Sequence, residues 1–415
     1  MVDGPNLFAL PPGVDFPAEL VEGLLALVAD KPPEALARVT LIVNTQRMRR
    51  CVTECLQAKG ARLLPRLMLI TEATSLVRLV LPKPMSPLRR RLELSVLLEG
   101  LLATGTTHFP RTALYDLADS LAALMEEMQG EGVSPDDIAR LDVANHSAHW
   151  ARTQAFLGIV TAVLGGEAPD AESVLRRAVM QLAEDWTITP PADPVILAGS
   201  TGSRGTTALL VQAIARLPSG AVVLPGYDFD MPPSVWERMD DALTAEDHPQ
   251  YRFRRVMDLM GCGPAAIRPW TAAQAPDPGR NRLISLSLRP APITDQWLTE
   301  GPNLPDLPPA TEGLTLIEAP GERAEAMAIA LILREAAESG VRAALISPDR
   351  NLTRRVTAAL DRWGIRPDDS AGRPLALSAP GRLMRQVAAL FGQKLTGDAL
   401  LALLKHPLAF SGPGR

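Results

Sequence analysis

The sequence predicts an α/β protein built on parallel sheets, with a large helical insertion in its first domain. Short apolar runs alternate with helical patterns near the start, a nearly all-helical block covers about 86–186, and the alternation then resumes. Residues 289–313 contain six prolines and little periodicity, which is typical of a linker. We therefore expect a first domain at 1–288 and a second α/β domain at 314–415.

The first domain contains five apolar runs of strand length, separated by segments with helical spacing. The expected strands are residues 6–10, 39–43, 62–70, 195–198 and 221–224. The expected helices outside the insertion run from Phe16 to Val28, from the polar turn Asn44–Gln46 onward to about Ala58, with the turn itself outside the helix, and over about 206–216, 233–243 and 250–260. Because the runs alternate in type, the strands are expected to be parallel and covered by helices.

The insertion is recognised by helical patterns alone. One apolar stripe comprises Leu114, Leu117, Leu121, Leu124, Met125 and Met128. Ser134, Pro135, Asp136 and Asp137 predict a helix start, with serine as N-cap and acids in the first turn. Further helices are expected from about His149 to Leu164 and up to about Trp186.

The second domain begins with a similar alternation. Strands are expected at 314–318 and 343–346, and helices at 321–337 and 350–363, followed by two short helical stretches.

The composition excludes some classes of protein. The net charge is −5, so any contact with DNA must come from a local basic patch or from a partner. The three cysteines, Cys51, Cys55 and Cys262, form no CxxC pair and suit a reducing compartment. No signal-peptide pattern and no apolar run of membrane-spanning length occurs, so we expect a cytoplasmic protein with no membrane contact.

No catalytic constellation is recognisable. The sequence lacks GxSxG, HExxH and DxDxDG patterns, and its five histidines have no metal-ligand spacing to acids or cysteines. The acid pairs are sequence neighbours, which on a helix point about 100° apart, so they do not surround one substrate. We expect no catalytic residue and no metal site in this chain.

The most site-like local feature is the glycine-rich stretch Gly199–Gly205, between an expected strand and helix. Backbone N–H groups at such a helix start can bind phosphate, and Asp228 or Asp230 after the next strand could hold a ribose. The spacing matches neither dinucleotide-binding nor P-loop patterns, so a plain turn is favoured. A nucleotide-binding α/β enzyme using this turn remains an alternative.

Three basic clusters could meet nucleic-acid phosphates, or could be solvated helix faces. They are Arg47 with Arg49 and Arg50, Arg89 with Arg90 and Arg91, and Arg252 with Arg254 and Arg255.

The order of these elements resembles a superfamily 1 helicase, with a RecA-type domain interrupted by a helical insertion and followed by a second such domain. Several stretches resemble the AddB family, a subunit of a bacterial helicase–nuclease that repairs double-strand breaks. They are LPPGVDF, VILAGSTGS, AVVLPGYD, HPQYRFRRVMDLMG, GLTLIEAPGERAEAMAIA, ALISPDRNLTRRV, DDSAGRPLA and LLKHPLA. They run from residue 10 to residue 407, so the resemblance covers nearly the whole chain.

The chain departs from active helicases at two positions. Pro12 and Gly13 stand where a phosphate-binding loop needs Gly-Lys-Ser/Thr, and Gly199 and Ser200 stand where an Asp-Glu pair holds Mg²⁺ and orients water. We therefore expect a degenerate nucleotide site without ATP hydrolysis, and a structural role for Ser200.

The resemblance implies a non-catalytic portion that guides DNA beside the AddA motor subunit. Thr45, Gln46 and Arg47, with Arg50 nearby, match the turn that faces single-stranded DNA, and Asp369, Ser370 and Arg373 lie in a loop that could face the strand channel. Full-length members add a nuclease domain with an iron–sulfur cluster and Mg²⁺, absent from these 415 residues, so we expect no cofactor here and a truncated second domain. A scaffold that never touches DNA remains a further alternative.

Overall fold

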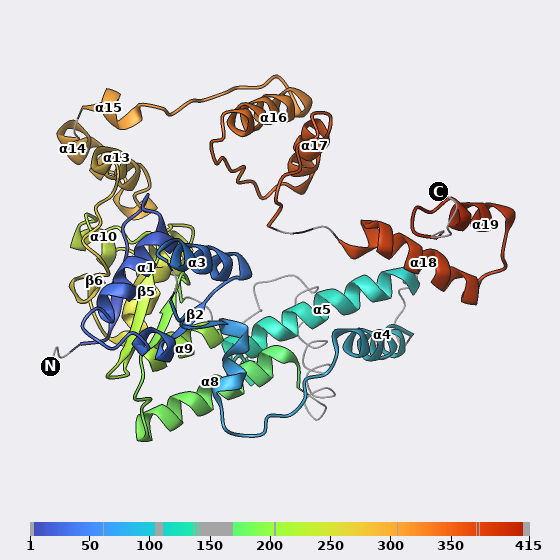
Figure 1. Cartoon of the computed structure of the whole chain (residues 1–415), viewed down its shortest axis with the longest axis horizontal. Helices are drawn as coiled ribbons and strands as arrows, with labels where there is room; N and C mark the ends of the chain where they lie inside the picture. Colours follow the sequence, from blue (N-terminus) through green and yellow to red (C-terminus); the bar gives the residue numbers. More distant parts are fainter. Residues whose placement is uncertain are drawn as a thin grey trace. The chain divides into compact units, whose positions relative to one another are not determined.

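The structure is a computed structural model that divides into two compact units, unit 1 from Met1 to Glu312 and unit 2 from Gly313 to Arg415 (Figure 1). The residues it describes are 4–60, 62–103, 111–134, 136–137, 140, 169–202, 205–304, 306–370, 372 and 374–409.

Unit 1 is built on a six-stranded, all-parallel sheet with the strand order β3-β2-β4-β5-β1-β6. The strands are β1 (Leu7–Ala9), β2 (Thr40–Val43), β3 (Arg66–Leu69), β4 (Val195–Ala198), β5 (Gly220–Leu224) and β6 (Arg268–Pro269). The five strands expected from apolar runs are confirmed. The sixth, β6, is a two-residue edge strand with a proline, which gives no recognisable pattern.

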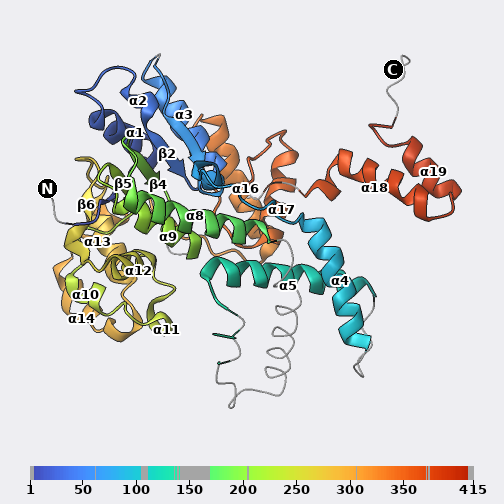
Figure 2. The ribbon, with the colours of Figure 1, turned by 90° about the horizontal axis from the view of Figure 1, so that it is seen from below.

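Alternation along the central strands places a core on each face of the sheet. In β2, Leu41 and Val43 pack with α1 (Phe16–Leu27) and α3 (Gln46–Ala58), whereas Ile42 faces the other side. That second face is covered by α8 (Ala171–Ile188), α9 (Gly205–Ala215) and α12 (Tyr251–Met260). Figure 2 shows α1 and α3 on one side of the strands and α8 and α9 on the other. Unit 1 is therefore a three-layer α/β structure, consistent with a RecA-like fold.

The remaining elements of unit 1 are shorter or belong to the insertion. They are α2 (Ala35–Arg38), η1 (Ile70–Leu76), α4 (Pro87–Ala103), α5 (Arg111–Glu131), α10 (Pro233–Glu237), α11 (Ala242–Ala245), η2 (Pro264–Ala266), α13 (Pro278–Ser287), η3 (Ala291–Ile293), α14 (Gln296–Glu300), η4 (Gly301–Asn303) and α15 (Leu307–Thr311).

The described part of the expected insertion is helical, as predicted. Helices α4 and α5 pack through an apolar cluster that includes Leu94, Leu98 and Leu121. The buried ion pair between Arg90 and Asp170 (2.5 Å) ties the start of α4 to the start of α8, where Asp170 is also the N-cap.

Two sequence predictions for the insertion are confirmed only in part. Of the predicted stripe on α5, Leu114, Leu121, Met125 and Met128 are buried, while Leu117 and Leu124 are exposed. At the predicted helix start, Ser134 Oγ accepts from the Asp137 N–H (3.2 Å), and the Asp137 carboxylate accepts from the Ser134 N–H (2.8 Å). The helix expected at 149–164, and Pro135, lie outside the described residues.

The insertion meets the sheet at a very close backbone approach. A Cβ atom added to Gly205, the first residue of α9, would lie 1.8 Å from the backbone oxygen of Gly130 at the end of α5. Arg176 on α8 donates to the same oxygen (2.7 Å), and Thr206 Oγ1 donates to Glu172 (2.6 Å). This packing requires glycine at position 205, because no side chain fits between the backbones of α5 and α9.

Two predicted segments take a different form. The single helix expected at 233–243 is two short helices, α10 and α11, because Asp241 caps a new start by accepting from the Leu243 N–H (2.9 Å). The expected linker 289–313 instead holds four short helical segments, and the boundary between units falls at its end, after Glu312. Buried Arg289 binds Gln296 (2.7 Å) and Glu300 (3.1 Å), which fixes this segment.

Unit 2 contains α16 (Glu322–Glu338), α17 (Arg350–Asp361), η5 (Leu375–Leu377), α18 (Ala379–Gly392) and α19 (Gly397–Leu404). The predicted helices are present, and α16 packs on α17 through Ala330, Val356 and Leu360. The expected strands at 314–318 and 343–346 are not formed in the described part of unit 2. These segments have no strand partner, and Leu316 (87%) and Ile346 (94%) are largely exposed.

Gly205→Ala tests the contact between insertion and sheet. The added methyl group must displace the backbone of Gly130, so we expect a loss of about 1–3 kcal/mol of unfolding free energy in urea titrations. Gly100→Ala is the matched control, because Gly100 lies in α4 with no atom near its missing side chain. It should be neutral or stabilise by up to about 1 kcal/mol. Equal effects of the two variants would contradict the proposed close packing.

Candidate nucleic-acid interface at the carboxyl edge of the sheet

The six parallel strands of unit 1 all end at one edge of the sheet, so the segments that follow them begin at that edge. Ligands of open α/β sheets bind at this edge, in crevices where neighbouring connections leave for opposite faces. Here α1 and α3 leave for one face and α9 and α12 for the other. The relevant crevices therefore lie between the ends of β2 and β4 and between those of β5 and β1.

The loop after β1 contains Pro12 and Gly13, at the position of a phosphate-binding loop. Gly13 has a left-handed backbone (φ 85°), and Pro276 lies 3.1 Å from the position its Cβ would take. Asp15 is the N-cap of α1 and accepts from the Ala18 N–H (3.3 Å), while Pro17 has no N–H to offer. A carboxylate of the chain itself thus occupies the helix start at which a phosphate would bind.

The loop after β4 contains Gly199 and Ser200, which the resemblance noted in the sequence aligns with the acid pair of an active helicase. Gly199 is buried and left-handed (φ 77°), and its N–H donates to Val223 O (3.2 Å). Ser200 Oγ accepts from the Gly202 N–H (3.2 Å), and the space beside Gly202 is closed by Val211 and Val256. Ser200 Oγ therefore holds the turn from within, and the Gly199 N–H joins the turn to β5.

The start of α9 faces an acidic cleft of about 390 Å³. Its lining includes Gly205, Thr206, Thr207 and the four carboxylates of Glu126, Glu127, Glu131 and Glu172. Negative charge beside a helix start opposes the binding of a phosphate. The acidic cleft therefore disfavours a phosphate at the start of α9, while Ser203 and Arg204 of the preceding turn lie outside the described residues.

The loop after β2 leads into α3 and carries the predicted DNA-contacting residues. Thr45 is the N-cap and accepts from the Met48 N–H (3.1 Å), and Gln46, Arg47 and Arg50 follow on the exposed face. The first turn of α3 has no acidic residue. A helix start is partially positive, so arginines there are unfavourable for the helix, and an anion bound at that position would offset this cost.

Arg49, in the same turn of α3, forms an ion pair within the protein. It pairs with Glu72 of η1 (3.2 Å), and Glu72 also accepts from the Leu69 N–H (2.9 Å) at the end of β3. Arg49 therefore joins α3 to η1, whereas the side chains of Arg47 and Arg50 are exposed.

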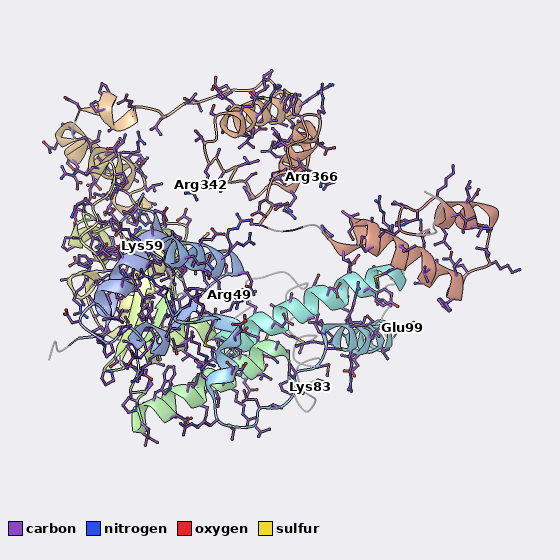
Figure 3. The ribbon with its side chains drawn as sticks, viewed as in Figure 1. Arg49, Lys59, Lys83, Glu99, Arg342 and Arg366 are labelled. Carbon is purple, nitrogen blue, oxygen red and sulfur yellow. The ribbon has the colours of Figure 1, made fainter. Side chains whose placement is uncertain are left out.

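Two clefts beside η1 were not predicted. One, of about 470 Å³, includes Arg66 in its lining, and the other, of about 510 Å³, includes Lys83. Both share the hydroxyl groups of Thr71, Thr74 and Ser75. Figure 3 labels Arg49 on α3 and Lys83 in the segment before α4. The run of hydroxyl residues directly after β3 is the feature of the sequence that could have indicated these clefts.

The carboxylate of Asp228, proposed above as an alternative ribose ligand, is already engaged. It accepts from Ser285 Oγ (2.5 Å) and from the Asp230 N–H (3.0 Å). Gln250 bridges the same turn, accepting from the Asp228 N–H (3.0 Å) and donating to Gly226 O (2.8 Å). The Tyr227 N–H donates to Leu10 O (3.0 Å), which joins the ends of β5 and β1.

A buried histidine supports this turn. His248 Nδ1 accepts from the Gln250 N–H (3.1 Å), and its buried Nε2 has no hydrogen-bond partner among the residues that the structure describes. Burial lowers the pKa of His248 from its ordinary 6.5, and nearby Arg289 lowers it further, against the opposing effects of Asp228 and Asp247. The neutral imidazole is therefore the form that the fold selects.

Of the residues predicted in unit 2, Asp369 and Ser370 are exposed. Asp369 binds Arg350 (3.3 Å), Ser370 lies beside it in the chain, and Arg373 is outside the described residues.

Within the described ranges, no three His, Cys, Asp or Glu side chains are grouped as a metal site. No helix in the same part of the chain is long and apolar enough to span a membrane.

His248→Asn tests the buried histidine. A lowered histidine pKa contributes stability above the ordinary value near 6.5, and this stability is lost as the pH falls through it. Asparagine can accept the same hydrogen bond without titrating. We expect the thermal midpoint of the wild type to fall more than that of the variant between about pH 7.5 and about pH 5.5. Parallel pH profiles would exclude a contribution from His248.

No family model matches the chain, and no curated protein is significantly similar to it. The interpretation of this edge therefore depends on its own geometry and charge.

Proposed function

We propose that this chain is the non-catalytic, helicase-like portion of an AddB-type subunit, which guides DNA during cytoplasmic double-strand-break repair and homologous recombination. In this proposal, a separate AddA motor subunit supplies ATP hydrolysis, and unit 1 holds single-stranded DNA near a duplex end. A carboxy-terminal nuclease domain, with its iron–sulfur cluster and Mg²⁺, would belong to the full-length subunit.

The observation that carries the proposal is the start of α3. Thr45, Gln46, Arg47 and Arg50 are exposed together where a helix start already favours anions. A phosphate backbone supplies negative charge at regular spacing, so it satisfies both the helix start and the arginines. The clefts beside η1, which the Arg49–Glu72 pair joins to α3, have hydroxyl groups of the kind that bind phosphate and sugar oxygens, and their linings also include Glu72 and Glu172.

The loops after β1 and β4 support a role without nucleotide hydrolysis. Asp15 caps the helix start that would bind phosphate, and the Gly199–Gly202 turn offers no carboxylate for Mg²⁺. The acidic cleft at α9 further opposes an anionic cofactor at that turn.

The test is the double variant Arg47→Ala with Arg50→Ala, measured by fluorescence anisotropy with a labelled single strand over a range of salt concentrations. Two lost phosphate contacts should weaken binding and reduce the slope of log affinity against log salt by about 1.4.

The matched control is Arg38→Ala with Arg216→Ala, which removes the same charge from exposed positions beside the amino ends of β2 and β5. It should leave the slope nearly unchanged. If the two double variants behave alike, the α3 surface is not the DNA site, and a scaffold without DNA contact becomes the better account.

A further inference from the structure

The start of α3 is joined to the neighbouring strand by Asn44, the residue between β2 and the N-cap Thr45. Its side-chain Nδ2 donates to the backbone oxygen of Gly199 (2.5 Å), across the crevice between the ends of β2 and β4. This crevice is one of the two at which a ligand of an open α/β sheet would lie. A hydrogen bond within the protein therefore spans the crevice.

The acceptor is itself rigidly placed. Gly199 is buried, its N–H is bound to Val223 O, and its left-handed backbone sets the direction of its carbonyl group. The space beside its Cα is closed by Met48 Cε (3.3 Å), Asn44 Oδ1 (3.4 Å) and Phe16 Cε1 (3.5 Å), measured to an added Cβ. The loops after β1, β2 and β4 thus meet at Gly199.

The opposite side of the same helix turn is fixed by a different contact. Arg49 pairs with Glu72, which also binds the backbone of Leu69 at the end of β3. The first turn of α3 is consequently held from β4 through Asn44 and from β3 through Arg49. Arg47 and Arg50 lie in that turn and the next, so their placement depends on both contacts.

We infer that Asn44 is a positioning residue, which holds the start of α3 through Gly199 so that Arg47 and Arg50 meet the phosphates of a single strand without a bound nucleotide. The inference rests on the proposed function, since it assumes that these arginines contact DNA. Asn44 acts through the arginines and needs no contact with DNA of its own.

A double-mutant cycle separates positioning from a general structural effect. Asn44→Leu keeps the approximate size of the side chain and removes the donor to Gly199. The variant is made in the wild-type chain and in the Arg47→Ala, Arg50→Ala background, and anisotropy with a labelled single strand gives the affinity and its salt dependence. Asn44→Ala repeats the cycle as a second variant, and thermal midpoints verify folding.

We expect Asn44→Leu to weaken binding roughly 3- to 10-fold in the wild-type chain, with a smaller salt slope, and to have little further effect in the arginine-free background. An equal loss in both backgrounds, or no loss in the wild type, would overturn the positioning role. An arginine double variant that binds like the wild type would instead refute the proposed function, so the two failures are distinguishable.

Discussion

The burial of the central strands on both faces is the constraint on which the rest of unit 1 depends. Alternate residues of β2, β4 and β5 face two separate cores, one with α1 and α3 and the other with α8, α9 and α12. Neither face of the sheet can then carry polar chemistry. Functional groups are confined to the strand ends, where loops of different sequence regions meet.

At the carboxyl edge, hydrogen bonds within the protein occupy the crevices in which ligands of open α/β sheets bind. Asp15 caps α1, Asn44 binds Gly199, and the Tyr227 N–H binds Leu10 O, so the two crevices are joined from within. Because these contacts are intramolecular, they are present without ligand. In the proposed function, a single strand would lie across this edge, on groups that are already held in place.

Two helix starts in unit 1 have side chains of opposite charge beside them. The start of α9 faces four glutamates, whereas the start of α3 carries exposed arginines and no acid in its first turn. The overall charge of −5 hides this contrast, since it averages over the chain. Local charge of this kind determines where a polyanion can approach.

The sequence by itself determined the α/β class, the five main strands, the helices in the described part of the insertion and the turns directly after β2 and β4, because apolar periodicity and capping residues are local signals. Only the tertiary structure decided which loops meet. The Asn44–Gly199 contact joins residues 155 positions apart, and the cleft of Glu126 and Glu172 joins two helices. It also showed that residues 314–318 and 343–346 form no ladder, since strand pairing depends on a partner that the segment's own pattern does not specify.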